Sequence, residues 1–129
     1  MSDLTQTATQ SVKLLHQLIE DIFDGARHAI AECLNHFADD FVMVTPSGKS
    51  LTLNEVAALF SELAGARKGM TIVIEDCQVI TQSEREVVIQ YREVQQMAGQ
   101  MNVRISLAVI DCTTQPPRWR YLQETRIAD

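Results

Sequence analysis

The hydrophobic pattern of this chain changes its period once, near Met70, and this change constrains the fold more than any other feature. Before Met70, apolar residues recur at the spacing of amphipathic helices. After it, apolar and polar residues alternate through long segments joined by short turns, as in antiparallel strands. Helices gathered in one half of the chain and strands in the other predict an α+β fold rather than alternating βαβ units.

The first half of the chain predicts three helices and a short strand. Residues 11–23 carry a broad apolar stripe, Asp24-Gly25 is a break, and helical spacing resumes over 26–37. The apolar run 41–45 predicts a buried strand, and Ser50-Leu51 a brief return strand. Thr52 and Glu55 match a capping box that starts the third helix, which we expect to end near Gly65.

The second half predicts four strands, over residues 70–81, 86–96, 102–112 and 118–127. The links between them are short, so neighbouring strands should form antiparallel hairpins. The chain contains no linker or repeat, and we expect one domain over residues 1–129, with residues 1–9 as a loose leader. Three N-terminal helices should therefore pack on one face of a curved, mainly antiparallel sheet.

Composition excludes several functional classes. The net charge is −6, which gives no electrostatic reason to bind nucleic acid or an anionic membrane. Neither a secretory signal nor an apolar run of about 20 residues is present, so we expect a cytoplasmic protein. The three cysteines are scattered and share no ligand spacing with the histidines, so we expect buried thiols and assign neither a metal nor another cofactor.

Strand alternation predicts which side chains face the helices. A turn centred near Gly99 would pair Glu93 with Ile105, and a turn centred near Gln115 would pair Leu107 with Gln123. This register places polar side chains on the inner, helix-covered face, namely Tyr91, Glu93, Gln95, Tyr121, Gln123 and Thr125. Buried polar groups of this kind either form a satisfied network or line a pocket. The outer face would then mix Arg92, Arg104, Arg120, Glu124 and Arg126 with apolar residues, and we expect it to form a homodimer.

Element order and three segments of the chain resemble the nuclear transport factor 2-like superfamily, also called SnoaL-like or ketosteroid-isomerase-like, with a cystatin-like fold. The segments are residues 39–48, 91–95 and 119–125, and the resemblance covers nearly the whole chain. It implies a cone-shaped α+β barrel, in which a strongly bent sheet wraps around the helices and leaves an apolar pocket. Members of this superfamily include isomerases, dehydratases, ligand binders and dimerisation modules, so the fold does not settle the function.

The chain departs from the ketosteroid isomerase pattern at two places. Those enzymes have an aspartate base just before the turn that follows the first strand, where this chain has Thr45. They also have a tyrosine on the first helix, and residues 11–23 contain none. A steroid-isomerase mechanism in that form is therefore not expected.

We expect a pocket whose polar lining comes from the inner sheet face. Within it, Glu93 is the candidate acid/base and Tyr91 or Tyr121 the candidate hydrogen-bond donor to a developing oxyanion. The expected ligand-contacting residues are Tyr91, Glu93, Gln95, Trp119, Tyr121, Gln123, Thr125, Thr45, Met43 and His16.

Three functional hypotheses stay open. The first is a protein that binds a small apolar or carbonyl-containing molecule. The second is a cofactor-free isomerase or dehydratase that uses Glu93, and the third is a non-catalytic homodimerisation module.

Overall fold

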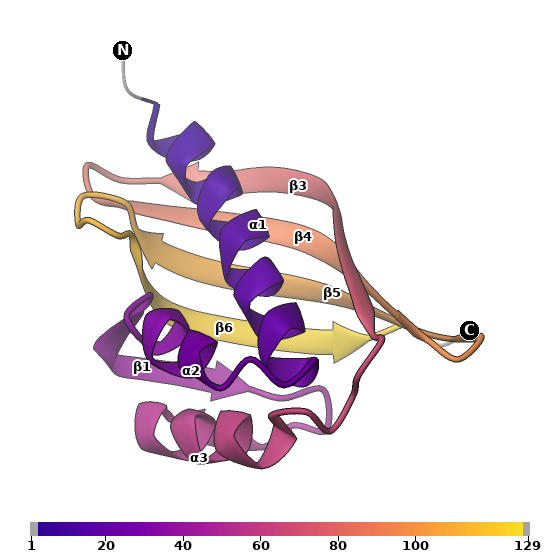
Figure 1. Ribbon diagram of the computed structural model, residues 1–129. Coiled ribbons are helices and arrows are strands. Elements are labelled where there is room, and N and C mark those ends of the chain that lie inside the picture. The colour runs from indigo at the N-terminus through magenta and orange to yellow at the C-terminus, as the bar shows by residue number, and fades with distance from the viewer. Residues whose placement is uncertain (1–2, 128–129) are drawn as a thin grey trace.

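The computed structural model describes residues 3–127 and contains three helices and a single sheet, with two of the strands preceding the third helix (Figure 1). The helices are α1 (Leu4–Phe23), α2 (His28–Leu34) and α3 (Leu53–Leu63). The strands are β1 (Phe37–Val44), β2 (Ser50–Thr52), β3 (Thr71–Gln82), β4 (Glu86–Met97), β5 (Gln100–Asp111) and β6 (Arg118–Arg126). This order confirms the predicted α+β class.

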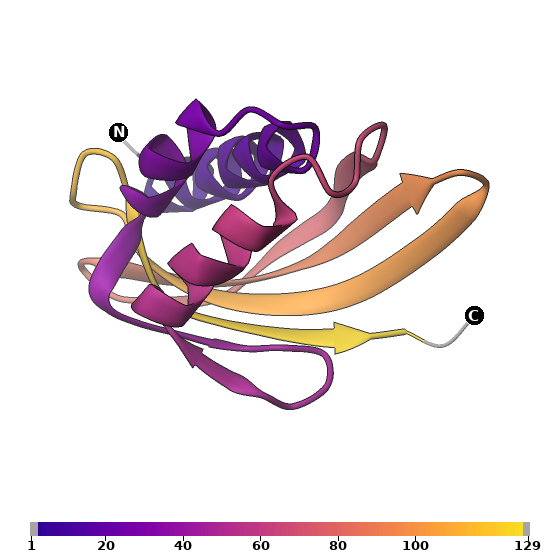
Figure 2. The same ribbon diagram turned by 60° about the horizontal axis from the view of Figure 1, so that its bottom comes forward.

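The six strands form one sheet in the order β2-β1-β6-β5-β4-β3. Strands β3 to β6 are antiparallel neighbours, whereas β1 runs parallel to β6. Figure 2 shows that the sheet is curved and that all three helices lie on its concave side, with α1 crossing the long strands and α3 lying over β1 and β2. The expected arrangement of three helices on one face of a mainly antiparallel sheet is confirmed.

Helix α1 begins earlier than the sequence pattern predicted. Asp3 caps it by accepting a hydrogen bond from the backbone N–H of Thr5, and Ala8 is fully buried. The prediction of a loose leader was therefore wrong for residues 3–9, while Met1 and Ser2 lie outside the described residues. Helix α3 begins as predicted, because Thr52 and Glu55 form both hydrogen bonds of the capping box.

The second helix is shorter, and the first strand longer, than predicted. Helix α2 ends at Leu34, and β1 already begins at Phe37, which the helical pattern had included. Phe37 and Phe41 pack against each other with ring centroids 4.4 Å apart. Phe37 and Phe41 are four residues apart, a spacing that is typical of a helix. Here both lie in strand β1, which has a register shift between Phe37 and Val42.

The predicted register between β4 and β5 was wrong by one residue. Glu93 pairs with Arg104 rather than with Ile105, and Tyr91 pairs with Ser106. The turn holds two residues rather than three, since Met97 pairs directly with Gln100. Ala98 and Gly99 both have positive φ angles, of 53° and 79°, as in the tight turns that match strand twist. The shift transfers Arg104, Ser106, Ala108 and Ile110 of β5 to the helix-covered face.

The predicted pairing of β5 with β6 is confirmed, but the face is reversed. Leu107 pairs with Gln123 and Val109 with Tyr121, as expected. Because β5 shifted its face, Tyr121, Gln123 and Thr125 now lie on the outer face, whereas Leu122 and Glu124 point inward and are buried. A bulge between Val109 and Ile110 keeps Trp119 on the inner side, where it is fully buried.

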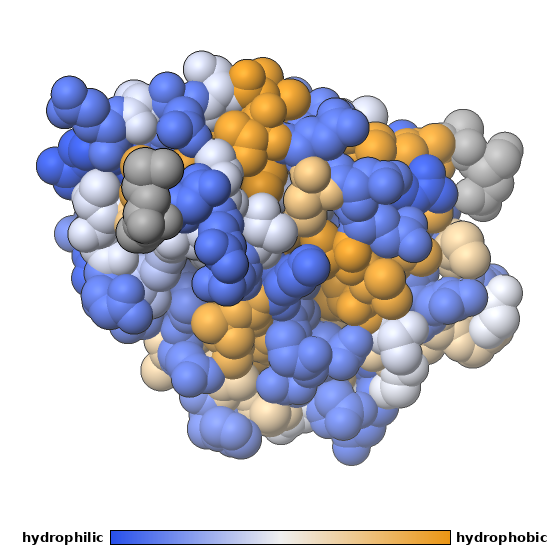
Figure 3. All heavy atoms as spheres, turned by 90° about the horizontal axis from the view of Figure 1, so that it is seen from above, coloured by the Kyte–Doolittle hydropathy of each residue, from blue (hydrophilic) through white to orange (hydrophobic). Residues whose placement is uncertain are grey.

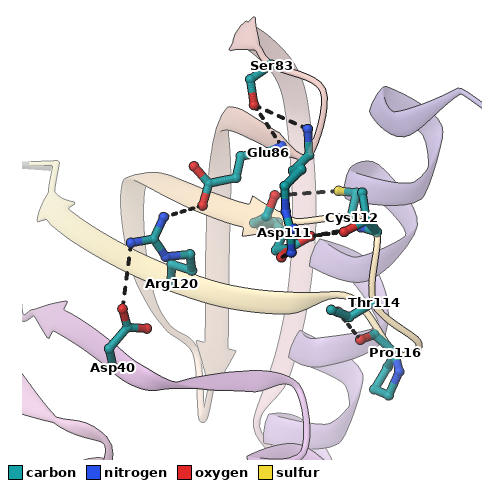
Figure 4. A network of polar contacts seen from close by, with 11 residues as sticks. Asp40, Ser83, Glu86, Asp111, Cys112, Thr114, Pro116 and Arg120 are labelled. Atoms are coloured by element: carbon teal, nitrogen blue, oxygen red, sulfur yellow. Dashed lines mark hydrogen bonds and ion pairs between the residues drawn. The ribbon is translucent and has the colours of Figure 1, made fainter.

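One hydrophobic core joins α1, α2, α3 and the inner sheet face. Trp119 is anchored in it by a hydrogen bond from Nε1 to Ser11 Oγ, 2.9 Å long. At one end of the sheet, Arg120 of β6 lies between Asp40 of β1 and Glu86 of β4 and forms an ion pair with each (Figure 4). These exposed ion pairs hold strand ends together, and their contribution to stability is small.

Apolar side chains also reach the surface. Hydrophobic patches lie between hydrophilic ones when the molecule is viewed from above (Figure 3). The large exposed apolar residues are Leu14, Val73, Val79, Ile80 and Met101. No helix within residues 3–127 has the length and hydropathy to cross a membrane, and the cytoplasmic location remains a prediction.

Candidate functional site: an apolar cavity with a buried ionic cluster

A cavity of about 230 Å³ lies between the inner sheet face, α1 and α3. Its walls are mostly apolar and include Phe23, Phe37, Phe41, Met43, Leu59 and Phe60. Its polar side chains are His16, Thr45, Arg67, Glu93, Gln95, Arg104 and Glu124. The cavity therefore combines an aromatic interior with several ionisable groups.

His16 and Glu93 form a buried ion pair beside this cavity. Nε2 of His16 lies 3.2 Å from Oε1 of Glu93, and each side chain is 3% exposed. Nδ1 of His16 lies 2.8 Å from the carbonyl oxygen of Val12, one turn earlier on α1, and donates to it. Because both ring nitrogens face acceptors, the geometry suits a protonated His16 beside an ionised Glu93.

Two further side chains surround this pair. Nε2 of Gln95 donates a hydrogen bond of 2.7 Å to Oε2 of Glu93. The two carboxylate oxygens of Glu93 thus contact different side chains, His16 at Oε1 and Gln95 at Oε2. The Tyr91 hydroxyl lies 3.5 Å from Nε2 of His16, and the tyrosine is fully buried. Within the described chain, Gln95 Oε1, on the cavity wall, is buried without a hydrogen-bond partner. Such atoms usually have a water or a ligand as partner.

Glu124 and Arg104 form the second ionic pair of the cluster. Nη1 of Arg104 donates to Oε1 of Glu124 over 3.0 Å, and its Nε donates to Oδ1 of Asn102. Glu124 is 5% exposed, and Ser106 is its cross-strand neighbour. Arg104 thus donates only some of its five N–H groups to hydrogen bonds with described protein groups.

The two carboxyl groups have opposite pKa shifts. Burial opposes ionisation of Glu93, but the charge of His16 and the hydrogen bonds from His16 and Gln95 outweigh it, so the pKa of Glu93 is lowered to about 2. Burial raises the pKa of Glu124 to about 7. The negative charge of Glu93 adds to this rise, whereas the positive charge of Arg104 reduces it. Glu124 is therefore the carboxyl poised to exchange a proton near neutral pH.

The shifts of the two ring systems follow from the same surroundings. Burial lowers the pKa of His16, but the charge of Glu93 and the hydrogen bonds to Glu93 and Val12 raise it by more, so the net direction is upward. Burial, and then the charges of Glu93 and Glu124, raise the pKa of Tyr91. Tyr91 is therefore a hydrogen-bond donor or acceptor at physiological pH, never an anion.

The structure brings together five of the residues expected in the pocket. His16, Met43, Thr45, Glu93 and Gln95 all line the cavity. Tyr91 and Trp119 lie beneath it in the core, where their rings pack edge to face at 6.3 Å. The expectation for Tyr121, Gln123 and Thr125 was wrong, because the register of β5 places these side chains on the outer face of the sheet.

Sequence reasoning missed Arg104 and Glu124, which it had placed on the outer face. The signal that would have found them is Ala98-Gly99, read as a two-residue turn with glycine at its second position. It also missed Arg67, which follows α3 and whose guanidinium carbon lies 5.3 Å from the centre of the Phe23 ring. Within the described part of the chain, no group of histidine, cysteine and carboxylate side chains has the arrangement of a metal site.

Comparison with solved structures identifies the fold. An NTF2-like protein of unknown function from Pseudomonas aeruginosa superposes with a TM-score of 0.89 at 28% identity, over 95% of this chain and 99% of that one. The chain has the nuclear transport factor 2-like (NTF2-like) fold. An NTF2-like protein from Cytophaga hutchinsonii matches this NTF2-like chain with a TM-score of 0.78 at 17% identity, covering 98% of this chain and all of the other.

The predicted cystatin-like description is also confirmed. A domain of unknown function with a cystatin-like fold from Nostoc punctiforme has a TM-score of 0.68 to the NTF2-like chain at 16% identity, over 94% of this chain and 78% of that one. No family model matches the sequence, and no curated protein matches it. The function of this NTF2-like chain must therefore be argued from its own cavity.

Proposed function

We propose that this NTF2-like chain binds a small, mainly apolar molecule whose polar group meets the buried ionic cluster. One observation carries the proposal: a single cavity has aromatic walls and, at its polar side, His16, Glu93, Arg104 and Glu124. Burying ionisable side chains such as His16, Glu93 and Glu124 costs free energy even when they are paired, and apolar replacements of buried pairs are often neutral or stabilising. Their presence beside an apolar cavity favours recognition of a ligand.

The volume of the cavity limits the ligand. A cavity of about 150 Å³ lined by apolar residues holds benzene. At about 230 Å³, this cavity has room for a ring of that size with a short polar substituent. Small aromatic or branched aliphatic molecules fit this volume, whereas ligands of drug size need at least about 300 Å³.

Proton transfer is a second candidate function, favoured by the raised pKa of Glu124. An isomerase or dehydratase acting without a cofactor needs a group that gains and loses a proton near neutral pH. Glu124, with its pKa near 7, suits that role better than Glu93, whose carboxylate is held ionised by His16. In this alternative, Glu124 exchanges the proton with the ligand, while Glu93 and Gln95 orient the surrounding donors.

We also propose that two copies of the chain pair through the outer sheet face. With the corrected register, this face carries Val88, Val94, Ile105, Leu107, Val109 and Tyr121, next to the polar Gln90, Arg92, Gln123 and Thr125. It is more apolar than the sequence pattern had predicted. A half-buried apolar sheet surface of this kind is typical of a subunit interface. A non-catalytic dimerisation module remains the third alternative.

The binding proposal is tested with a variant that fills the cavity. Met43 lines the cavity, so Met43→Trp should occupy ligand space, whereas Leu14→Trp adds the same ring on the exposed side of α1. A panel of small aromatic and aliphatic acids, alcohols and ketones is screened by thermal unfolding. We expect at least one compound to raise the midpoint of the parent protein and of Leu14→Trp, but not of Met43→Trp. Equal shifts in all three proteins would contradict binding in this cavity.

A further inference from the structure

The charges around the cavity are unbalanced toward the positive side. The charge of His16 is offset by Glu93, and that of Arg104 by Glu124. Arg67 also lines the cavity and has no ion-pair partner among residues 3–127. In a chain with a net charge of −6, an unpaired guanidinium on the wall of an apolar cavity is an unexpected feature.

A second hollow extends this positive region. A cleft next to the hairpin of β4 and β5 shares Arg67 and Gln95 with the cavity, and Arg126 also lines it. Arg126 is the cross-strand neighbour of Arg104 on β6, so like charges lie side by side at this end of the sheet. Two acidic side chains at the end of α1 and just after it have other partners: Glu20 accepts from the backbone N–H of Ile72, and Asp24 from that of Gly69.

From this arrangement we infer that the ligand is a small organic carboxylate, held by Arg67 and Arg104 with its apolar body in the aromatic part of the cavity. The inference rests on the proposed binding function. A guanidinium presents its N–H groups as a fork that matches the two oxygens of a carboxylate. Both arginines have donors that the described protein groups leave unused.

The protonation state of Glu124 decides whether Arg104 is free to bind an anion. While Glu124 is ionised, its carboxylate competes with the ligand for Arg104. A proton on Glu124 removes this competitor, and the groups that surround it are Glu93 on β4, Arg104 on β5 and His16 on α1. Carboxylate binding should therefore be accompanied by proton uptake.

The test compares an acid with its neutral isostere. Phenylacetate and phenylacetamide have nearly the same shape and differ in charge, as do benzoate with benzamide and hexanoate with hexanamide. Affinity is measured by titration calorimetry near pH 7 for the parent protein, for Arg67→Gln and Arg67→Lys, and for Arg92→Gln. Arg92 is the matched control, because it is half-exposed on β4 and pairs with Glu75 rather than lining the cavity.

We expect the best acid to bind the parent protein and Arg92→Gln about tenfold more tightly than its amide, as befits charge-assisted hydrogen bonds. Arg67→Gln should remove this preference, and Arg67→Lys should keep part of it. Titrations in buffers of different ionisation enthalpy should reveal the uptake of a proton.

Equal affinity for acid and amide would overturn the carboxylate inference while leaving the binding function in place. If no acid or amide of this size binds, the carboxylate inference fails, and the binding function fails with it when the alcohols and ketones of the thermal screen do not bind either.

Discussion

Glu93 Oε1 lies 3.2 Å from His16 Nε2, and this contact joins β4 to α1 beneath an apolar cavity. The same carboxylate accepts a hydrogen bond from Gln95 on its other oxygen. Glu124 lies on the same sheet face and has the higher pKa of the two carboxyl groups, so it keeps its proton to a higher pH. The division of two buried carboxyl groups into one ionised and one titrating group is the main chemical feature of the molecule.

Breaking the His16–Glu93 pair should cost more than replacing it. Glu93→Gln leaves a buried imidazolium without its counter-charge and should lower the free energy of unfolding by about 3 kcal/mol. The double-mutant cycle itself uses one substitution at each site: the double variant His16→Leu with Glu93→Leu removes both charges and should cost less than the single variants His16→Leu and Glu93→Leu together. Denaturant unfolding of the four proteins measures this coupling. Simple additivity of the two losses would mean that the pair has no net interaction.

Glu124 should make the protein less stable as the pH rises from about 4.5 toward about 7. Its pKa is raised from 4.5 to about 7 on folding, so the folded state holds the proton more tightly and loses that advantage over this range. The lowered pKa of Glu93 acts below this window, and its stabilisation is lost only as the pH falls below 4.5. The raised pKa of His16 acts above 6.5, and its stabilisation is lost as the pH rises.

The Glu124 contribution is isolated by substitution. Glu124→Gln should abolish a decrease of about 1–3 kcal/mol in unfolding free energy between about pH 4.5 and about pH 6.5. Glu75→Gln, which changes an exposed carboxylate on β3, should retain the decrease. The measurement is urea unfolding at several pH values. An unchanged slope in Glu124→Gln would show that another group titrates.

The hydrogen bond between Trp119 and Ser11 should be needed for stability. Ser11→Ala leaves the fully buried indole N–H without an acceptor, and the unfolding free energy should fall by about 1–3 kcal/mol. Ser11→Thr keeps a hydroxyl at the position and serves as the control. Because Trp119 is the only tryptophan, its fluorescence reports the transition directly. A loss as large in Ser11→Thr would point to packing rather than to the hydrogen bond.

The outer sheet face should be the dimer interface. Leu107→Glu places a charge at the centre of the outer face, on β5 between β4 and β6, and should convert a dimer to a monomer. Val79→Glu introduces the same charge on β3, opposite Ile89 and therefore on the other face, and should leave the dimer intact. Sedimentation equilibrium distinguishes the two masses. A monomeric parent protein, or a dimeric Leu107→Glu, would contradict this interface.

Local signals explain which parts of the fold could be predicted from the sequence. The change of period near Met70, the Thr52–Glu55 capping box and the break at Asp24-Gly25 depend on neighbouring residues, and each occurs in the structure. The position of Glu93 and Gln95 on the inner, helix-covered face of the sheet followed from the alternation of side chains within β4. These features needed no knowledge of long-range pairing.

The rest of the site depended on one turn. Whether the link at Ala98-Gly99 holds two or three residues decides which face every side chain of β5 and β6 occupies. The positive φ of Ala98 is unusual for a residue with a side chain, so composition favoured the longer loop. Arg104 and Glu124 were consequently expected on the outer face of the sheet, away from the cavity. Arg67 lies in a loop, where periodicity carries no information.

The most direct test of the binding proposal is methyl NMR of the methionines during titration with the same small acids and amides. The chain has five methionines, of which Met43 lines the cavity and Met101 is an exposed reference on β5. Binding in the cavity predicts that a ligand that stabilises the protein shifts the Met43 methyl resonance more than that of Met101, in proportion to occupancy. A stabilising ligand that leaves Met43 unmoved, or a panel in which no compound moves it, would contradict the account.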